Sequence, residues 1–162
     1  PVMLVPRNNN WSEIETVMAV TDHLSGDNHL VSYAAALTSA GGTLVLAHVE
    51  DEQAFRRYIH TIAKIPSIDT AEAEKVLREQ LLKEPADYIL SCQQVFQQRA
   101  DQGFQVESVI MLGHLMEDYK RLIQRHEINL LVLNTKDEDQ LAMHGLAYPL
   151  AIEMREIPLL LL

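Results

Sequence analysis

Histidine and acidic residues gather where the predicted strands of this chain end. They stand at seven positions: Asp22, His23, His48, Asp51, His114, Asp137 and His144. Because ligands bind beyond the carboxyl ends of the strands in open α/β sheets, these side chains are expected at one crevice. Imidazoles and carboxylates that converge there could bind a transition metal, or change charge together near neutral pH. Polar side chains are also common in solvated loops, and we predict this solvated arrangement and no metal site.

The sequence lacks the common catalytic motifs. It contains no GxSxG nucleophile turn, no HExxH zinc helix and no DxDxDG calcium loop. The single cysteine, Cys92, excludes an internal disulfide and a CxxC motif, and it is expected as a small buried residue on a helix face. Such cysteine usage suits a reducing compartment. We therefore predict a cytoplasmic protein that is not an enzyme and needs no cofactor.

The composition predicts one globular domain. Of the 162 residues, 48% are hydrophobic and 22% are charged, which are ordinary values for a folded domain of this length. The formal net charge is -10, and the 13 Lys and Arg residues are spread along the chain. This balance argues against a surface that follows nucleic-acid phosphates, so we expect no nucleic-acid partner. No apolar stretch reaches the ~20 residues that a membrane-spanning helix needs.

Five short runs rich in apolar residues predict parallel strands. They lie near residues 16–21, 43–49, 105–112, 129–134 and 158–162. The run from Leu130 to Leu133 has no polar alternation, which is typical of a strand that is covered on both faces. Amphipathic segments between the runs predict helices, and strand–helix–strand units cross over right-handed. The predicted fold class is α/β: an open three-layer, Rossmann-like sheet with helices on both faces.

Prolines divide the beginning and the middle of the chain. Residues 1–10 are predicted to form a short strand, Val2 to Val5, and a polar linker, a segment that could derive from a preceding domain; the main domain is 11–162. Pro66 separates two predicted helices, the second of which is capped by Asp69. Pro85 is expected to end that helix and to start a third one.

Several local sequences, taken in order, resemble those of the universal stress protein family. They are Ala19-Val20-Thr21-Asp22, His48-Val49, Leu112-Gly113, Asn129-Leu130-Leu131-Val132-Leu133 and the closing segment from Glu153 through Pro158 to Leu162. The resemblance covers the chain from Thr16 to its last residue. It implies a five-stranded parallel sheet of order 3-2-1-4-5, and dimers that pair through the last strand.

Many members of that family bind ATP with a glycine loop, G-x-x-G followed by G-Ser/Thr, from which this sequence departs. The first two glycines fall on Asn134 and Asp137, and the final pair falls on Ala147-Tyr148. If the final proline is aligned differently, the final pair falls on Gly145-Leu146 instead. Glycine is used there because backbone N–H groups must approach the phosphates closely. The acidic run 137–139 also places like charge near a triphosphate, at a cost on the order of 1–4 kcal/mol for each close pair of charges. We predict weak ATP binding or none.

The resemblance also implies which residues would line a nucleotide or small-ligand crevice. Asp22 and Val49 match the positions that contact ribose and adenine. Gly113, Asn134 and Thr135 complete the candidate set, because they too follow predicted strands.

The function predicted from these features is that of a non-enzymatic stress-response or regulatory binding module. Leu159 to Leu162 form an apolar edge strand, which is expected to pair antiparallel with its symmetry mate or with the amino-terminal strand in a homodimer. Two alternatives remain open. The chain could be the cytoplasmic regulatory domain of a membrane transporter, such as a cation/proton antiporter or a permease. It could also be a stress protein that binds ATP or AMP weakly.

Overall fold

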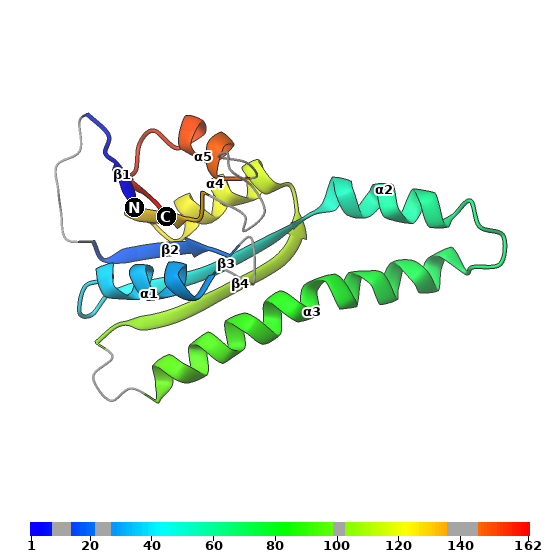
Figure 1. Cartoon of the computed structure of the whole chain (residues 1–162), viewed down its shortest axis with the longest axis horizontal. Helices are drawn as coiled ribbons and strands as arrows, with labels where there is room; N and C mark the ends of the chain where they lie inside the picture. The colour runs from blue at the N-terminus through cyan, green and yellow to red at the C-terminus, as the bar shows by residue number, and fades with distance from the viewer. Residues whose placement is uncertain (8–13, 22–26, 99–102, 136–145) are drawn as a thin grey trace.

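A six-stranded sheet forms the centre of this computed structural model, which describes residues 1–7, 14–21, 27–98, 103–135 and 146–162. The strands are β1 (Val2–Leu4), β2 (Thr16–Val20), β3 (Thr43–Asp51), β4 (Gln105–Gly113), β5 (Leu130–Leu133) and β6 (Leu159–Leu161). Their order is β1-β6-β5-β2-β3-β4 (Figure 1). Strands β2 to β6 are parallel, which confirms the five predicted strands and their order 3-2-1-4-5.

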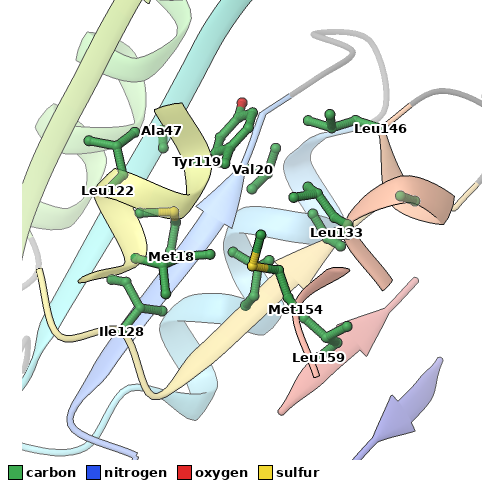
Figure 2. Packing of buried hydrophobic residues seen from close by; sticks show 14 of the residues in the cluster. Met18, Val20, Ala47, Tyr119, Leu122, Ile128, Leu133, Leu146, Met154 and Leu159 are labelled. Atoms are coloured by element: carbon green, nitrogen blue, oxygen red, sulfur yellow. The ribbon is translucent and has the colours of Figure 1, made fainter. Parts of the chain in front are cut away.

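Helices cover both faces of the sheet. They are α1 (Asp27–Leu37), α2 (Glu52–Ile62), α3 (Thr70–Gln97), α4 (Leu115–Arg125) and α5 (Ala147–Glu153). Helices α1 and α3 pack on one face against Val17. Helices α4 and α5 pack on the other face against Met18 (Figure 2). Successive strand residues point to opposite faces, so both faces of β2 and β5 must be apolar. This burial on both faces explains why the sequence of these two strands is apolar without alternation.

Strand β1 adds a sixth strand that the prediction of a five-stranded sheet did not include. It pairs antiparallel with β6 of the same chain, with Met3 opposite Leu160. The predicted pairing of the closing strand with the amino-terminal strand therefore occurs within one chain. The side chains of β6 are buried, whereas those of Val2, Met3 and Leu4 are 36–59% exposed. The outer edge of β6 is thus already hydrogen-bonded, and the exposed edge on this side of the sheet belongs to β1.

Helix α3 corrects the prediction that Pro85 ends one helix and starts another. The helix is continuous over 28 residues, with Pro85 inside it, and Asp69 caps it as predicted by accepting the N–H groups of Ala71 and Glu72 at 2.9 and 3.2 Å. A proline inside a helix removes one hydrogen bond and crowds the preceding turn. Tertiary packing offsets this penalty, because Pro85 is buried and Ile89 and Phe96 fix the following turns against the sheet. In the part of the chain that the structure describes, no helix has the length and apolar character needed to cross a membrane.

Pro85→Ala is expected to stabilise the protein by about 1–2 kcal/mol in urea denaturation. A helix-interior proline costs about 3 kcal/mol relative to alanine, and loss of the buried ring returns part of this gain. Ala86→Pro, at the next position of the same helix, should instead destabilise the protein. A loss of stability in Pro85→Ala would show that the two halves of α3 need the proline to fit the sheet.

Candidate functional site

The pairing of β2 with β3 ends before β3 does, at the carboxyl edge of the sheet where the candidate residues lie. This pairing runs to Val20 and Ala47, and the Thr21 N–H still donates to the Ala47 carbonyl at 2.9 Å. Strand β3 then continues to Asp51, and among the described strands only β4 pairs with this part of it. The Val49 N–H lies on the side that faced β2, so it has lost its strand partner. This is the part of an open α/β sheet at which ligands are bound.

Tyr119 of helix α4 supplies the missing partner. Its phenol oxygen accepts the Val49 N–H at 3.1 Å, across 70 positions of sequence. Tyr119 is 1% exposed and Val49 is 4% exposed. The ring belongs to the same buried cluster as Val20 and Ala47 (Figure 2). The backbone group at the position matched to an adenine contact is therefore already hydrogen-bonded inside the protein.

His48 of β3 links this strand to the residue that follows β2. Its Nδ1 lies 2.5 Å from the Thr21 carbonyl oxygen, so Nδ1–H donates to it, and Nε2 lies 3.3 Å from the Glu50 carboxylate. The imidazole is buried. The imidazole donates to the Thr21 carbonyl, which would otherwise accept a hydrogen bond from the Val49 N–H of β3. The Val49 N–H donates to Tyr119 instead. The His-Val pair thus has a structural role in this chain.

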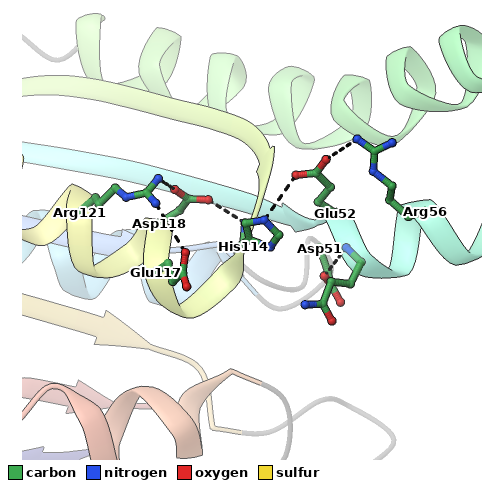
Figure 3. A network of polar contacts seen from close by, with 8 residues as sticks. Asp51, Glu52, Arg56, His114, Glu117, Asp118 and Arg121 are labelled. Atoms are coloured by element: carbon green, nitrogen blue, oxygen red, sulfur yellow. Dashed lines mark hydrogen bonds and ion pairs between the residues drawn. The ribbon is translucent and has the colours of Figure 1, made fainter.

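A polar network surrounds the start of α4, where Gly113 ends β4 (Figure 3). Asp118 is 5% exposed, and each of its carboxylate oxygens is bonded: one accepts the His114 N–H at 2.7 Å, and the other accepts Arg121 Nη1 at 2.7 Å. His114 Nε2 also lies 3.9 Å from the Glu52 carboxylate, which links the beginnings of α4 and α2. A Cβ atom on Gly113 would lie 2.2 Å from Asp118 Oδ2. A side chain at this position would therefore have to displace the capping carboxylate of Asp118.

Thr135 and Asn134 follow β5. The Thr135 N–H donates to the Leu162 carbonyl at 2.9 Å, and the Thr135 hydroxyl donates to the same oxygen. The Leu162 N–H in turn donates to Leu133 at 2.9 Å. Thr135 thus extends the β5–β6 pairing past the regular strands. Asn134 is half-buried at the same edge of the sheet.

Three of the five candidate residues lie at the carboxyl edge of the sheet and are engaged in contacts within the protein. The Val49 N–H donates to the Tyr119 phenol, Gly113 lies against the Asp118 carboxylate, and the Thr135 hydroxyl donates to the Leu162 carbonyl. Asp22 lies outside the described residues, as do the candidate metal ligands at positions 23, 137 and 144 and the acidic loop. His48, Asp51 and His114 are described, and no group of three His, Cys, Asp or Glu side chains among the described residues could hold a metal ion.

Sequence reasoning missed two residues of this site. Neither Tyr119 nor Asp118 was among the candidate residues. A buried tyrosine usually needs a hydrogen-bond partner, so a tyrosine on an apolar helix face next to a strand end was the signal that could have found it. For Asp118 the signal was an acidic residue in the first turn of a helix that follows glycine.

Comparisons with known proteins identify the fold. No protein-family model matches the sequence, and no curated protein matches it either. Among solved structures, MJ0577, a protein described as hypothetical, superposes with a TM-score of 0.71 at 16% identity, over 93% of this chain and 96% of its own. The hypothetical protein PH0823 gives 0.60 at 13% identity, over 92% and 95%. Universal stress protein UspA from Lactobacillus plantarum gives 0.56 at 14% identity, over 93% and 99%.

Identities this low support a conclusion about the fold alone. The superpositions nevertheless cover nearly the whole of each chain, and the order of the parallel strands is the one that the sequence motifs implied. This chain therefore has the fold of the universal stress proteins.

Proposed function

We propose that this chain is a universal stress protein-type binding module of the cytoplasm, non-enzymatic and dimeric, that acts in regulation without using an adenine nucleotide. The observation that carries the proposal is the buried hydrogen bond from the Val49 N–H to the Tyr119 phenol. A ligand that reads the edge of an adenine ring needs this N–H group as a donor. In this chain the donor is already satisfied and enclosed.

Displacing Tyr119 would be costly for a nucleotide. The phenol and the Val49 N–H are both almost fully buried, so the ligand must replace a formed hydrogen bond and must also vacate the space of an aromatic ring. A buried donor left unpaired costs about 1–3 kcal/mol, and removal of a buried aromatic ring costs about 3–5 kcal/mol. The acidic run 137–139 adds repulsion for phosphates by its charge. This arrangement supports a function that does not depend on an adenine nucleotide.

Calorimetric titration of the protein with Mg-ATP, AMP and adenosine tests the proposal. No binding is expected up to millimolar ligand concentrations. Tyr119→Leu leaves the Val49 N–H unpaired and opens space beside it, so this variant should acquire weak binding of adenosine, which carries no phosphate. Tyr58→Leu changes an exposed tyrosine of α2 and serves as the matched control.

A dissociation constant in the low micromolar range for any of these nucleotides with the parent protein would refute the proposal. If neither the parent nor Tyr119→Leu binds adenosine, nucleotide exclusion stands but Tyr119 is not its cause. Native mass spectrometry of the protein purified from cells would show in addition whether a nucleotide or a different ligand is retained.

A further inference from the structure

The helical hairpin made by α2 and the first half of α3, residues 52–84, projects beyond the sheet (Figure 1). Phe55 anchors its base: the ring is 1% exposed, and the Arg78 guanidinium lies 5.0 Å above it. Pro85 is the next buried residue along the chain, and no residue in 56–84 is buried. The seam between the two helices is therefore only half-covered along its whole length.

Apolar side chains of the hairpin are left facing water. Tyr58, Ile65, Ile68 and Val76 are 41–55% exposed. An amphipathic helix of a soluble protein normally has its apolar face covered, and a four-helix bundle covers such faces in a core shared by all four helices. The exposed residues thus mark a surface that a further pair of helices would cover.

The charge of the hairpin differs from that of the rest of the chain. The hairpin carries six basic and six acidic residues, which leaves seven basic and seventeen acidic residues for the remainder, so the whole net charge of -10 lies outside the hairpin. Two copies can therefore bring their hairpins together without the repulsion that other surfaces would create.

The charges are also divided between the two helices. Residues 52–66 carry three basic residues and one acidic residue, whereas residues 67–84 carry three basic and five acidic residues. Four of these charged residues make no ion pair with any described residue. They are Arg57 and Lys64 in residues 52–66, and Glu72 and Glu79 in residues 67–84. A two-fold axis that places α2 of one copy on α3 of the other brings basic against acidic sides twice.

We propose that this hairpin is the self-association surface of the protein, and that two copies pack their hairpins into a four-helix bundle with α2 against the partner's α3. The proposal rests on the dimeric state in the proposed function and moves its interface away from β6, whose outer edge β1 occupies. A face roughly 20 Å long and two helices wide buries on the order of 800 Å² in total, which is the size of a weak, reversible interface. Dimerisation in the range of tens of micromolar follows.

Sedimentation velocity between 1 and 300 µM tests this surface with two charge-reversed variants. Arg57→Glu with Lys64→Glu makes both sides acidic, and Glu72→Lys with Glu79→Lys makes both sides basic. Each variant is expected to be monomeric over the whole range, because like charges then face each other. An equimolar mixture should dimerise again, and native mass spectrometry should show heterodimers, since both contacts in the mixed pair are complementary.

Two controls separate this surface from others. Arg125→Glu with Arg155→Glu makes the same charge change outside the hairpin and should dimerise as the parent does. Val2→Lys with Leu4→Lys places charge on the exposed strand β1 and should also leave the dimer intact. If the β1 variant alone is monomeric, or if the hairpin variants stay dimeric, or if mixing restores no dimer, the hairpin is not the interface. A parent protein that is monomeric at 300 µM overturns both the hairpin proposal and the dimeric state, while the nucleotide titration reports independently on the rest of the proposed function.

Discussion

Tyr119→Ala should lower the free energy of unfolding by about 4–8 kcal/mol, the largest effect that we expect from any single substitution at the candidate site. Removal of a buried aromatic ring costs about 3–5 kcal/mol, and the Val49 N–H, left unpaired in an apolar cluster, adds about 1–3 kcal/mol. Domains of this size are stable by only about 5–15 kcal/mol, so this variant can approach the unfolding limit at 37 °C. Urea denaturation at 10–25 °C, followed by circular dichroism, measures the difference.

Tyr119→Phe isolates the hydrogen bond from the packing. The ring is kept, so the measured loss reports on the phenol's hydrogen bonding, which includes acceptance of the Val49 N–H, and a loss of about 1–2 kcal/mol is expected. Tyr58→Ala, on a side chain that is 55% exposed, should change stability by less than about 0.5 kcal/mol. If Tyr119→Phe is as stable as the parent, the Val49 N–H has another acceptor, and the Tyr119 hydrogen bond is not what excludes a nucleotide.

Gly113→Ala should destabilise the protein by about 2–4 kcal/mol. The added Cβ would lie 2.2 Å from Asp118 Oδ2 and 3.2 Å from Asp118 Cγ, so the carboxylate must move. It cannot move without loss, because its two oxygens hold the His114 N–H and the Arg121 guanidinium. Overpacking of this kind costs about 1–3 kcal/mol, and a broken charged hydrogen bond adds to it.

A double-mutant cycle tests this explanation. Asp118→Ala removes the obstructing oxygen, so Gly113→Ala should cost much less in the Asp118→Ala background than in the parent. Gly103→Ala is the matched control, because a Cβ there would meet Ala40 at 3.4 Å, an ordinary van der Waals contact. If the effects of Gly113→Ala and Asp118→Ala simply add, the glycine is needed for a reason other than the carboxylate.

The candidate site was only partly predictable from the sequence. Val49, Gly113, Asn134 and Thr135 were expected at the carboxyl edge of the sheet, and the structure places them there. What each of them contacts was not predicted. The partner of Val49 is 70 residues away, and it depends on where α4 lies across β3, which no local window of sequence contains.

The sequence by itself determined the five parallel strands and the two covered faces of the central ones, because a strand buried on both sides must be apolar at every position, and that pattern is local. The order of the strands was implied by the family resemblance and not by this pattern. Only the tertiary structure decided the rest. Pro85 lies inside one continuous helix because packing on the sheet outweighs the proline's local preference. Strand β1 pairs with β6 of its own chain because strand pairing depends on which edges meet in space. The Val49 N–H donates to Tyr119 because the pairing of β2 with β3 ends before Val49 and α4 packs against β3, and such long-range contacts are encoded in the assembled fold and in no single segment.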